Sequence, residues 1–132
     1  MAAPSLVDVA DAIAEQARAT NLRATPFERD GDWQPPELMI PVPEVEQLTF
    51  GGDGVWSLRY ELLLVVSSAS DRAAHINLSA LLAPLKTRLQ SDQTLDGTAT
   101  GVWVREVRPD DQIRDRNETE WFGARLVLEV RT

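Results

Sequence analysis

Residues 56–66 read WSLRYELLLVV, and this stretch decides the fold. Its even-numbered side chains are all aromatic or aliphatic, and such period-two alternation is the pattern of a β-strand. The odd-numbered side chains begin polar, at Ser57, Arg59 and Glu61, and become apolar at Leu63 and Val65. The pattern therefore predicts a central strand that starts half-exposed and ends buried on both faces, as a strand covered by helices does.

One helix is predicted before this strand in the sequence, and another after it. Residues 5–19 form an amphipathic helix that Ser5 can cap. Its apolar positions recur at helical spacing: Leu6, Val9, Ala10, Ile13 and Ala17. The second helix begins near Asp71, and its apolar stripe consists of Ala74, Leu78, Leu81, Leu82, Leu85 and Leu89. Because Pro84 removes one helical hydrogen bond, we expect a kink or a break there.

The remaining strands are shorter or more polar. Residues 21–28 predict a short edge strand. Residues 37–42 lie between prolines, which are confined to sheet edges, so they predict a second edge strand with Leu38, Ile40 and Val42 on one face. The glycine cluster at residues 51–54 suits a hairpin turn. Residues 99–108 and 120–131 predict the last two strands, joined by a charged loop over residues 109–119.

The order of these elements is α-β-β-β-α-β-β. It predicts an α+β fold, with a mostly antiparallel or mixed sheet of four to five strands and two main helices packed on one face. The 132 residues are 43% hydrophobic and 26% charged, which is ordinary for a globular protein. Because neither a repeat nor a linker interrupts the pattern, we expect residues 1–132 to form a single domain.

Composition excludes several classes of protein. There is no cysteine, so a disulfide scaffold, a thiolate-bound zinc site and a thiol nucleophile are excluded. The formal net charge of −8 argues against a surface that binds nucleic acid by neutralising phosphates, although DNA can still pass close by. No stretch has the roughly 20 apolar residues of a membrane helix, and we expect no signal peptide.

The sequence offers little for catalysis. His75 is the one histidine, and a cluster with Ser70 and Asp71 is less plausible than a helix cap followed by an exposed helical residue. The carboxylates that could bind a metal are Asp30, Asp32, Asp110, Asp111 and Asp115. They lack the spacing of a calcium-binding loop, so we interpret them as solvated loop side chains. We therefore predict that the protein is not an enzyme, with no catalytic, metal-binding or cofactor-binding residue and no cofactor.

Two segments leave alternatives open. Trp33 stands before a proline pair and either closes a loop onto the core or contacts a partner, and we favour the first. Residues 105–120 carry four positive and six negative charges, with only Val107 and Ile113 apolar. Such a segment is either an unsupported hairpin tip or a loop that becomes ordered when charge-complementary copies meet.

Two motifs carry a resemblance to a known family. Residues 67–74 read SSASDRAA, between an apolar strand and a Leu-rich helix, and residues 89–97 read LQSDQTLDG. Together with the early helix, the Pro-rich segment and the final strands, this order resembles the tail-terminator and tail-completion proteins of long-tailed bacteriophages of actinobacterial hosts. Gln93 and Asp96 depart from the family pattern, which commonly has proline and glycine there.

The resemblance implies a structural virion protein, assembled in the host cytoplasm and located in the phage tail. Tail terminators form a ring, typically a hexamer, that caps the head-proximal end of the tail tube, stops tube polymerisation and joins the tail to the head-neck complex. The implied partners are further copies of the chain, the tail tube protein and head-neck connector proteins. DNA passes through the ring without sequence-specific binding, and no membrane is involved.

A head-to-tail ring needs two different surfaces on each subunit. We expect one on the strand at residues 37–42, through Leu38, Ile40 and Val42. We expect the other on the charged hairpin, through Arg108, Asp110, Asp111, Arg114, Asp115 and Arg116. Two alternatives remain: another head-tail connector or neck protein, and a cellular α+β binding module with a ligand groove at Trp33 and the Pro-rich segment.

Overall fold

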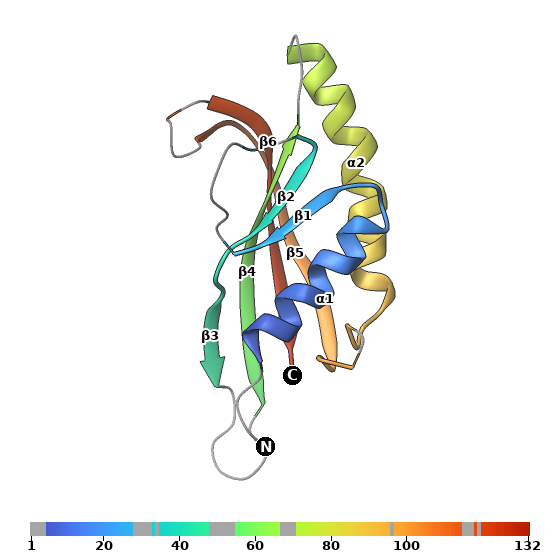
Figure 1. The fold of residues 1–132 in the computed structure, drawn as a ribbon, viewed down its shortest axis with the longest axis vertical. Coiled ribbons are helices and arrows are strands. Elements are labelled where there is room, and N and C mark those ends of the chain that lie inside the picture. Colours follow the sequence, from blue (N-terminus) through green and yellow to red (C-terminus); the bar gives the residue numbers. More distant parts are fainter. Residues whose placement is uncertain are drawn as a thin grey trace.

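The structure is a computed structural model of the chain. It describes residues 5–27, 33, 35–47, 55–66, 71–95, 97–114, 118 and 120–132. The helices and strands in chain order are α1 (Leu6–Arg18), β1 (Arg23–Pro26), β2 (Glu37–Ile40), β3 (Glu44–Gln47), β4 (Trp56–Val66), α2 (Asp71–Ser91), β5 (Gly101–Arg114) and β6 (Glu120–Arg131), as Figure 1 shows. The predicted α+β class is confirmed, with one more strand before α2 than the predicted order contains.

All six strands belong to one mixed sheet. Its order is β1-β2-β4-β6-β5, and β3 also pairs with β4. Among the strand pairs of the described residues, β1–β2 is the parallel one and the others are antiparallel. Strand β2 pairs with the end of β4 and β3 pairs with its start, so both lie along the same side of β4. The prolines at positions 41 and 43 separate these two strands because proline donates no ladder hydrogen bond.

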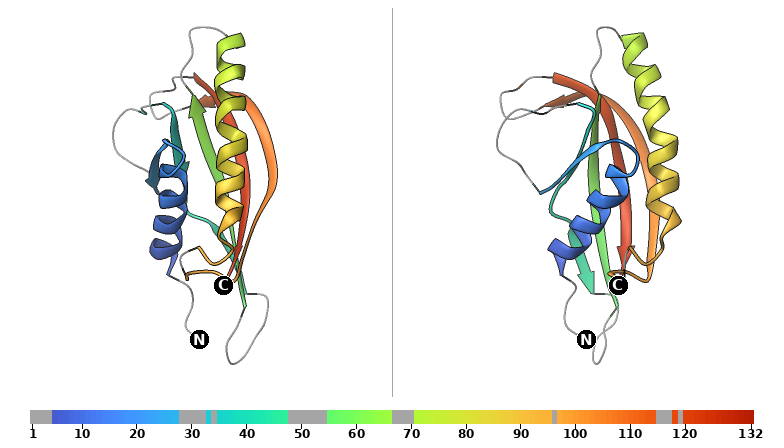
Figure 2. Two further views of the ribbon diagram at one scale, coloured as in Figure 1. Left: turned by 90° about the vertical axis from the view of Figure 1, so that its right-hand side faces the viewer. Right: turned by 45° about the vertical axis from the view of Figure 1, so that its right-hand side comes forward.

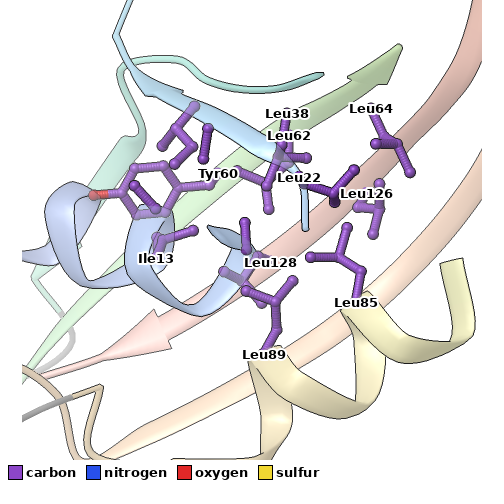
Figure 3. Close-up of a cluster of buried hydrophobic side chains, with 14 of the residues drawn as sticks. Ile13, Leu22, Leu38, Tyr60, Leu62, Leu64, Leu85, Leu89, Leu126 and Leu128 are labelled. Atoms are coloured by element: carbon purple, nitrogen blue, oxygen red, sulfur yellow. The ribbon is translucent and has the colours of Figure 1, made fainter. Parts of the chain in front are cut away.

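The longest ladder joins β4 to β6 and forms the centre of the core. Ten residue pairs connect them, from Ser57↔Arg131 to Val66↔Phe122. On the face that the helices cover, the ladder contributes fully buried side chains: Leu58, Tyr60, Leu62, Leu64, Ala124, Leu126, Leu128 and Val130. Figure 3 labels Tyr60, Leu62, Leu64, Leu126 and Leu128 among them. On the other side Arg59 and Glu61 are exposed, while Val65 is buried. The predicted change along β4 is therefore confirmed.

Both helices cover the same face of the sheet (Figure 2), as predicted. Helix α1 is capped as expected, since the N–H of Asp8 donates to Ser5 Oγ at 3.2 Å. Its buried side chains are mostly alanines, which let α1 lie close to β1 and β2: Ala10, Ala12, Ala14 and Ala17. Helix α2 buries Leu78, Leu85 and Leu89 against the core.

Of the predicted kink or break of α2 at Pro84, the break is wrong. The helix is continuous from Asp71 to Ser91. Pro84 lies on its exposed side, so water can bind the carbonyl that the proline leaves without a helical donor. The buried leucines lie on the opposite side, so the packing of the helix against the core does not depend on that hydrogen bond.

A small second cluster buries the end of β4 on the face without helices. Met39, Val65 and Ile113 form its buried centre, with Leu63 packed against it. Trp33 and Trp121 cover them, with ring centroids 6.3 Å apart. Ile113 and Trp121 belong to the far end of the β5–β6 hairpin, which bends away from the helices in Figure 1. The structure thus confirms that Trp33 packs against the core.

Two strand predictions need correction. Strand β2 is not an edge strand, because β1 pairs with its outer side. Leu38 and Ile40 are fully buried in the main core, where α1 contacts β2, whereas Val42, which follows β2, is 69% exposed. Strand β5 continues to Arg114, so residues 109–114 are strand rather than the predicted loop. The sequence of one segment does not show which strand will lie beside it. The neighbouring strand decides both corrections, because β1 pairs with β2 and β6 pairs with residues 109–114.

Several predictions fall outside the described residues. They include the glycine turn at residues 51–54, the possible cap residue Ser70, the carboxylates of Asp30 and Asp32, and the interface residues Asp115 and Arg116. No helix of the described part is long and apolar enough to cross a membrane.

We predict that Gly123→Ala strongly destabilises the fold. A Cβ at Gly123 would lie 1.9 Å from the backbone oxygen of Leu64, so the β4–β6 ladder itself must shift. Overpacking of this kind typically costs about 1–3 kcal/mol, which urea denaturation would measure. Gly101→Ala is the control, because its Cβ would meet only the Trp103 side chain, at 2.3 Å. Equal losses of stability in the two variants would contradict this account.

Candidate interaction surface

The face of the sheet opposite the helices carries charges of both signs. Glu129 on β6 lies at the centre of a cluster there, and its carboxylate accepts hydrogen bonds from Arg105 Nε at 2.8 Å and Ser57 Oγ at 3.1 Å. Arg131 approaches the same carboxylate at 3.5 Å. The Arg105 hydrogen bond holds the pKa of Glu129 below its usual value of 4.5, with smaller help from Ser57 and Arg131 and against the effect of burial.

Trp103 stacks within the same cluster. The guanidinium carbons of Arg105 and Arg131 lie 5.3 Å and 5.4 Å from the centroid of its ring system. These distances are within the range of cation–π interactions. The half-buried indole and the carboxylate of Glu129 therefore hold both guanidinium groups in place.

Two adjoining hollows cross this face, with volumes of about 440 and 380 Å³. Glu44, Arg59 and Val127 line both of them. Within the described part of the chain, the Arg59 guanidinium and the carboxylates of Glu44 and Glu46 form no ion pair or side-chain hydrogen bond. The surface thus combines internally paired charges near β5 with unpaired charges near β3.

The outer edge of β5 is covered over part of its length by two glutamine side chains. Gln93 Oε1 accepts from the N–H of Val102 at 2.9 Å, and its Nε2 donates to the carbonyl of Val102 at 2.9 Å. Gln90 Oε1 accepts from the N–H of Val104, also at 2.9 Å. These amides bind the backbone as a further strand would, and beyond them residues 105–109 are exposed.

The predicted interface residues occupy different places. Leu38 and Ile40 belong to the core, so neither is part of an exposed surface. Val42, which follows β2, and Arg108, on β5, line the same hollow from opposite edges of the sheet. Asp110 and Asp111 lie in β5, where the structure describes their backbone.

The exposed arginines of the hairpin pair with nearby carboxylates of the same chain. Arg108 pairs with Glu106 and Arg114 pairs with Glu120, both at 3.0 Å. All four side chains are at least 46% exposed, so these pairs contribute little to the stability of the fold. The arginines therefore stay accessible to a partner.

The described residues contain no group of three or more His, Asp or Glu side chains placed to hold a metal ion. His75 lies on the exposed side of α2, with its ring 4.6 Å from that of Phe122. The structure describes neither Ser70 nor the Asp71 side chain, so the Ser70–Asp71–His75 cluster lies outside the description.

Sequence reasoning missed the residues that shape the sheet edges. Gln90 and Gln93 gave no signal, since glutamine near the end of a helix usually faces solvent. The segment with Glu44 and Glu46 does carry a signal, because the alternation in Glu-Val-Glu-Gln is that of a short exposed strand. The segment was not predicted as a strand because it lies between prolines and the glycine cluster.

The chain matches no protein-family model and no curated protein.

We predict that Gln93→Ala opens the edge of β5. The variant loses the side-chain hydrogen bonds to both backbone groups of Val102, at a cost of about 1–2 kcal/mol. Hydrogen exchange followed by NMR should show faster exchange of the Val102 amide. Lys86→Ala, on an exposed position of α2, is the control. An unchanged Val102 exchange rate would show that the glutamine does not protect this edge.

We predict that Glu129→Gln makes stability less dependent on pH. A carboxyl whose pKa is lowered in the folded state stabilises the fold above its usual pKa of 4.5, and this contribution disappears as pH falls through the folded pKa. Wild type should therefore be more stable than the variant at pH 7, and the difference should narrow below pH 4.5. Thermal unfolding between pH 7 and pH 2.5 measures this. Glu120→Gln, whose partner Arg114 is exposed, should show a much smaller effect; equal effects would contradict the assignment.

Proposed function

We propose that the protein is a structural component of a phage virion, a tail terminator that forms a ring on the head-proximal end of the tail tube. Two kinds of evidence support this function. The motifs at residues 67–74 and 89–97 follow the order of the tail-terminator family. The order of a long strand, a helix and two final strands, β4, α2, β5 and β6, agrees with the order of elements in the resemblance.

One structural observation carries the proposal. At the start of β4 the strand order is β3-β4-β6-β5, so the sheet ends in β3 on one side and β5 on the other. These two outer strands differ in charge and length, so the molecule offers two unlike surfaces on opposite sides. A head-to-tail ring needs this asymmetry, whereas a two-fold dimer uses one surface twice.

The charge of the protein suits a passage for DNA. The net charge of −8 means that a ring of copies carries a large negative charge. A phosphate backbone is bound through Lys and Arg, and an acidic wall repels it. In this function the ring lets DNA move past without holding it, and the other contacts are made with tail tube protein and head-neck connectors.

We predict that the purified protein assembles into closed rings of about six copies. Sedimentation at increasing concentration gives the mass, and electron microscopy of the same sample shows whether the particles are closed. Rings that bind tail tube ends and limit tube length would support the terminator, while rings that bind only head connector protein would assign it to the neck instead. A monomer at every concentration, with no binding to tube ends, would contradict the proposal.

A further inference from the structure

We propose that neighbouring copies join into a continuous sheet, by antiparallel pairing of β3 from one copy with residues 105–108 of β5 from the next. This inference rests on the proposed function only in assuming that copies assemble. It goes beyond that function because it names the contact, its register and the residues that make it specific.

The outer side of β3 is open in the described part of the chain. β3 pairs with β4 alone and packs closely on no other helix or strand. Glu44, Val45 and Glu46 are all exposed, and Val45 keeps 45% of its surface accessible. A short strand with unpaired backbone groups on one side is a template for pairing with another chain.

The matching part of β5 has the same length. Gln90 and Gln93 bind the edge at Val102 and Val104, and Pro109 has no N–H to donate. Between these limits, residues 105–108 make a window of four residues, which equals the four residues of β3. A β-bulge between Val104 and Glu106 marks the start of this window. Bulges, prolines and charges also protect edges from unwanted pairing, so they restrict this edge to a short partner.

Strand direction also favours this contact. β3 runs antiparallel to β4, β4 to β6 and β6 to β5, so β3 and β5 run in opposite directions. Copies related by rotation about an axis near the strand direction keep these directions. The β5 of one copy therefore meets the β3 of the next in antiparallel orientation, which needs no rearrangement of either strand.

One register pairs the exposed valines of the two strands. Placing Val45 opposite Val107 brings together two exposed apolar side chains on the helix-covered face, where their own partners are Leu58 and Leu126. On the opposite face the same register places Glu44 opposite Arg108, and apolar pairs and opposite charges across strands are each favourable. It also places Glu46 opposite Glu106, a like-charge pair that opposes the contact, with Arg105 next to Glu106 at the bulge.

The charges also select against pairing of two β3 edges. Two β3 strands paired with Val45 opposite Val45 would bring the carboxylates of Glu44 and Glu46 together. Like charges on directly opposed strands are destabilising. Of the remaining contacts, the one between β3 and β5 joins unlike edges, so it produces a head-to-tail chain of copies that closes by rotation.

The geometry is compatible with closure. Within one copy, the cross-strand pairs Glu44–Arg59, Arg59–Glu129 and Glu129–Trp103 place Glu44 and Trp103 at the same height along the strands. The proposed contact instead places Glu44 of one copy opposite Arg108 of the next. Allowing for the bulge, each copy is displaced along the strands by about four residues, or roughly 13 Å. Four strands span roughly 19 Å at this level, so the strands tilt by about 35°, as they do in closed barrels.

Cysteine cross-linking tests the contact directly, because the chain has no cysteine of its own. We expect a Val45→Cys/Val107→Cys double variant to form a disulfide-linked ladder under mild oxidation, since opposed strand residues lie within disulfide reach. When the two single variants, Val45→Cys and Val107→Cys, are mixed, disulfides between unlike variants should form in at least about fivefold excess over disulfides between identical variants. Val7→Cys and Ile76→Cys, at exposed positions of α1 and α2, form the control pair.

The outcomes separate this contact from the ring itself. If wild type forms rings and the double variant cross-links no better than the control, the edge contact is wrong and the ring function stands. If wild type stays monomeric and no variant cross-links, both the contact and the assembly function are contradicted. A majority of like pairs would also overturn the contact, because it would indicate a two-fold dimer.

A charge exchange tests the specificity of the same contact. Glu44→Arg and Arg108→Glu should each weaken association by about fivefold or more, and the two together should restore it. Both side chains are exposed, so the folded monomer should keep its melting temperature. Glu15→Arg with Arg72→Glu repeats the charge changes on the helices and should have little effect. Weakening that the double exchange does not restore would overturn the Glu44–Arg108 pairing.

Discussion

The ten-pair ladder between β4 and β6 is the constraint on which the other elements depend. Its buried leucines supply the apolar surface against which both helices pack, and each fully buried side chain of this kind is worth about 1.5–3 kcal/mol. Because the ladder is antiparallel and in register over its length, it also fixes the opposite face, where Arg59, Glu61 and Glu129 alternate outward. The core and the charged surface are therefore two consequences of one strand pairing.

That arrangement leaves the groups available to a partner at the two edges of the sheet. One face of the sheet is occupied by the helices, and on the other the charges near β5 are largely paired within the chain. In the described residues, what stays open is the outer backbone edge of β3, with its carboxylates, and the outer backbone edge of the β5 window, at opposite edges of the sheet. A protein that offers two unlike edges is suited to repeated assembly with copies of itself, which is the property that a ring-forming virion protein needs.

The elements with strong periodic patterns were predictable from sequence. Helix α1, strand β4, the buried stripe of α2 and strand β6 follow their predictions closely. The failures concern neighbours: β2 has proline-rich flanks typical of an edge, yet β1 covers it. Residues 109–114 are mostly polar, with Ile113 the one aliphatic side chain, yet they extend a ladder with β6. Pro84 did not break α2 because it points to solvent. The Gln90 and Gln93 contacts depend on tertiary placement, which no local pattern encodes.

Hydrogen–deuterium exchange on the unmodified protein, compared between dilute and concentrated samples, tests the edge-to-edge account most directly. Pairing of unlike edges predicts that protection increases with concentration in two separate segments, residues 44–47 and residues 105–108, while the β4–β6 ladder stays equally protected in both samples. Protection that increases on the exposed sides of α1 and α2 instead, or in only one of the two edges, would contradict the account.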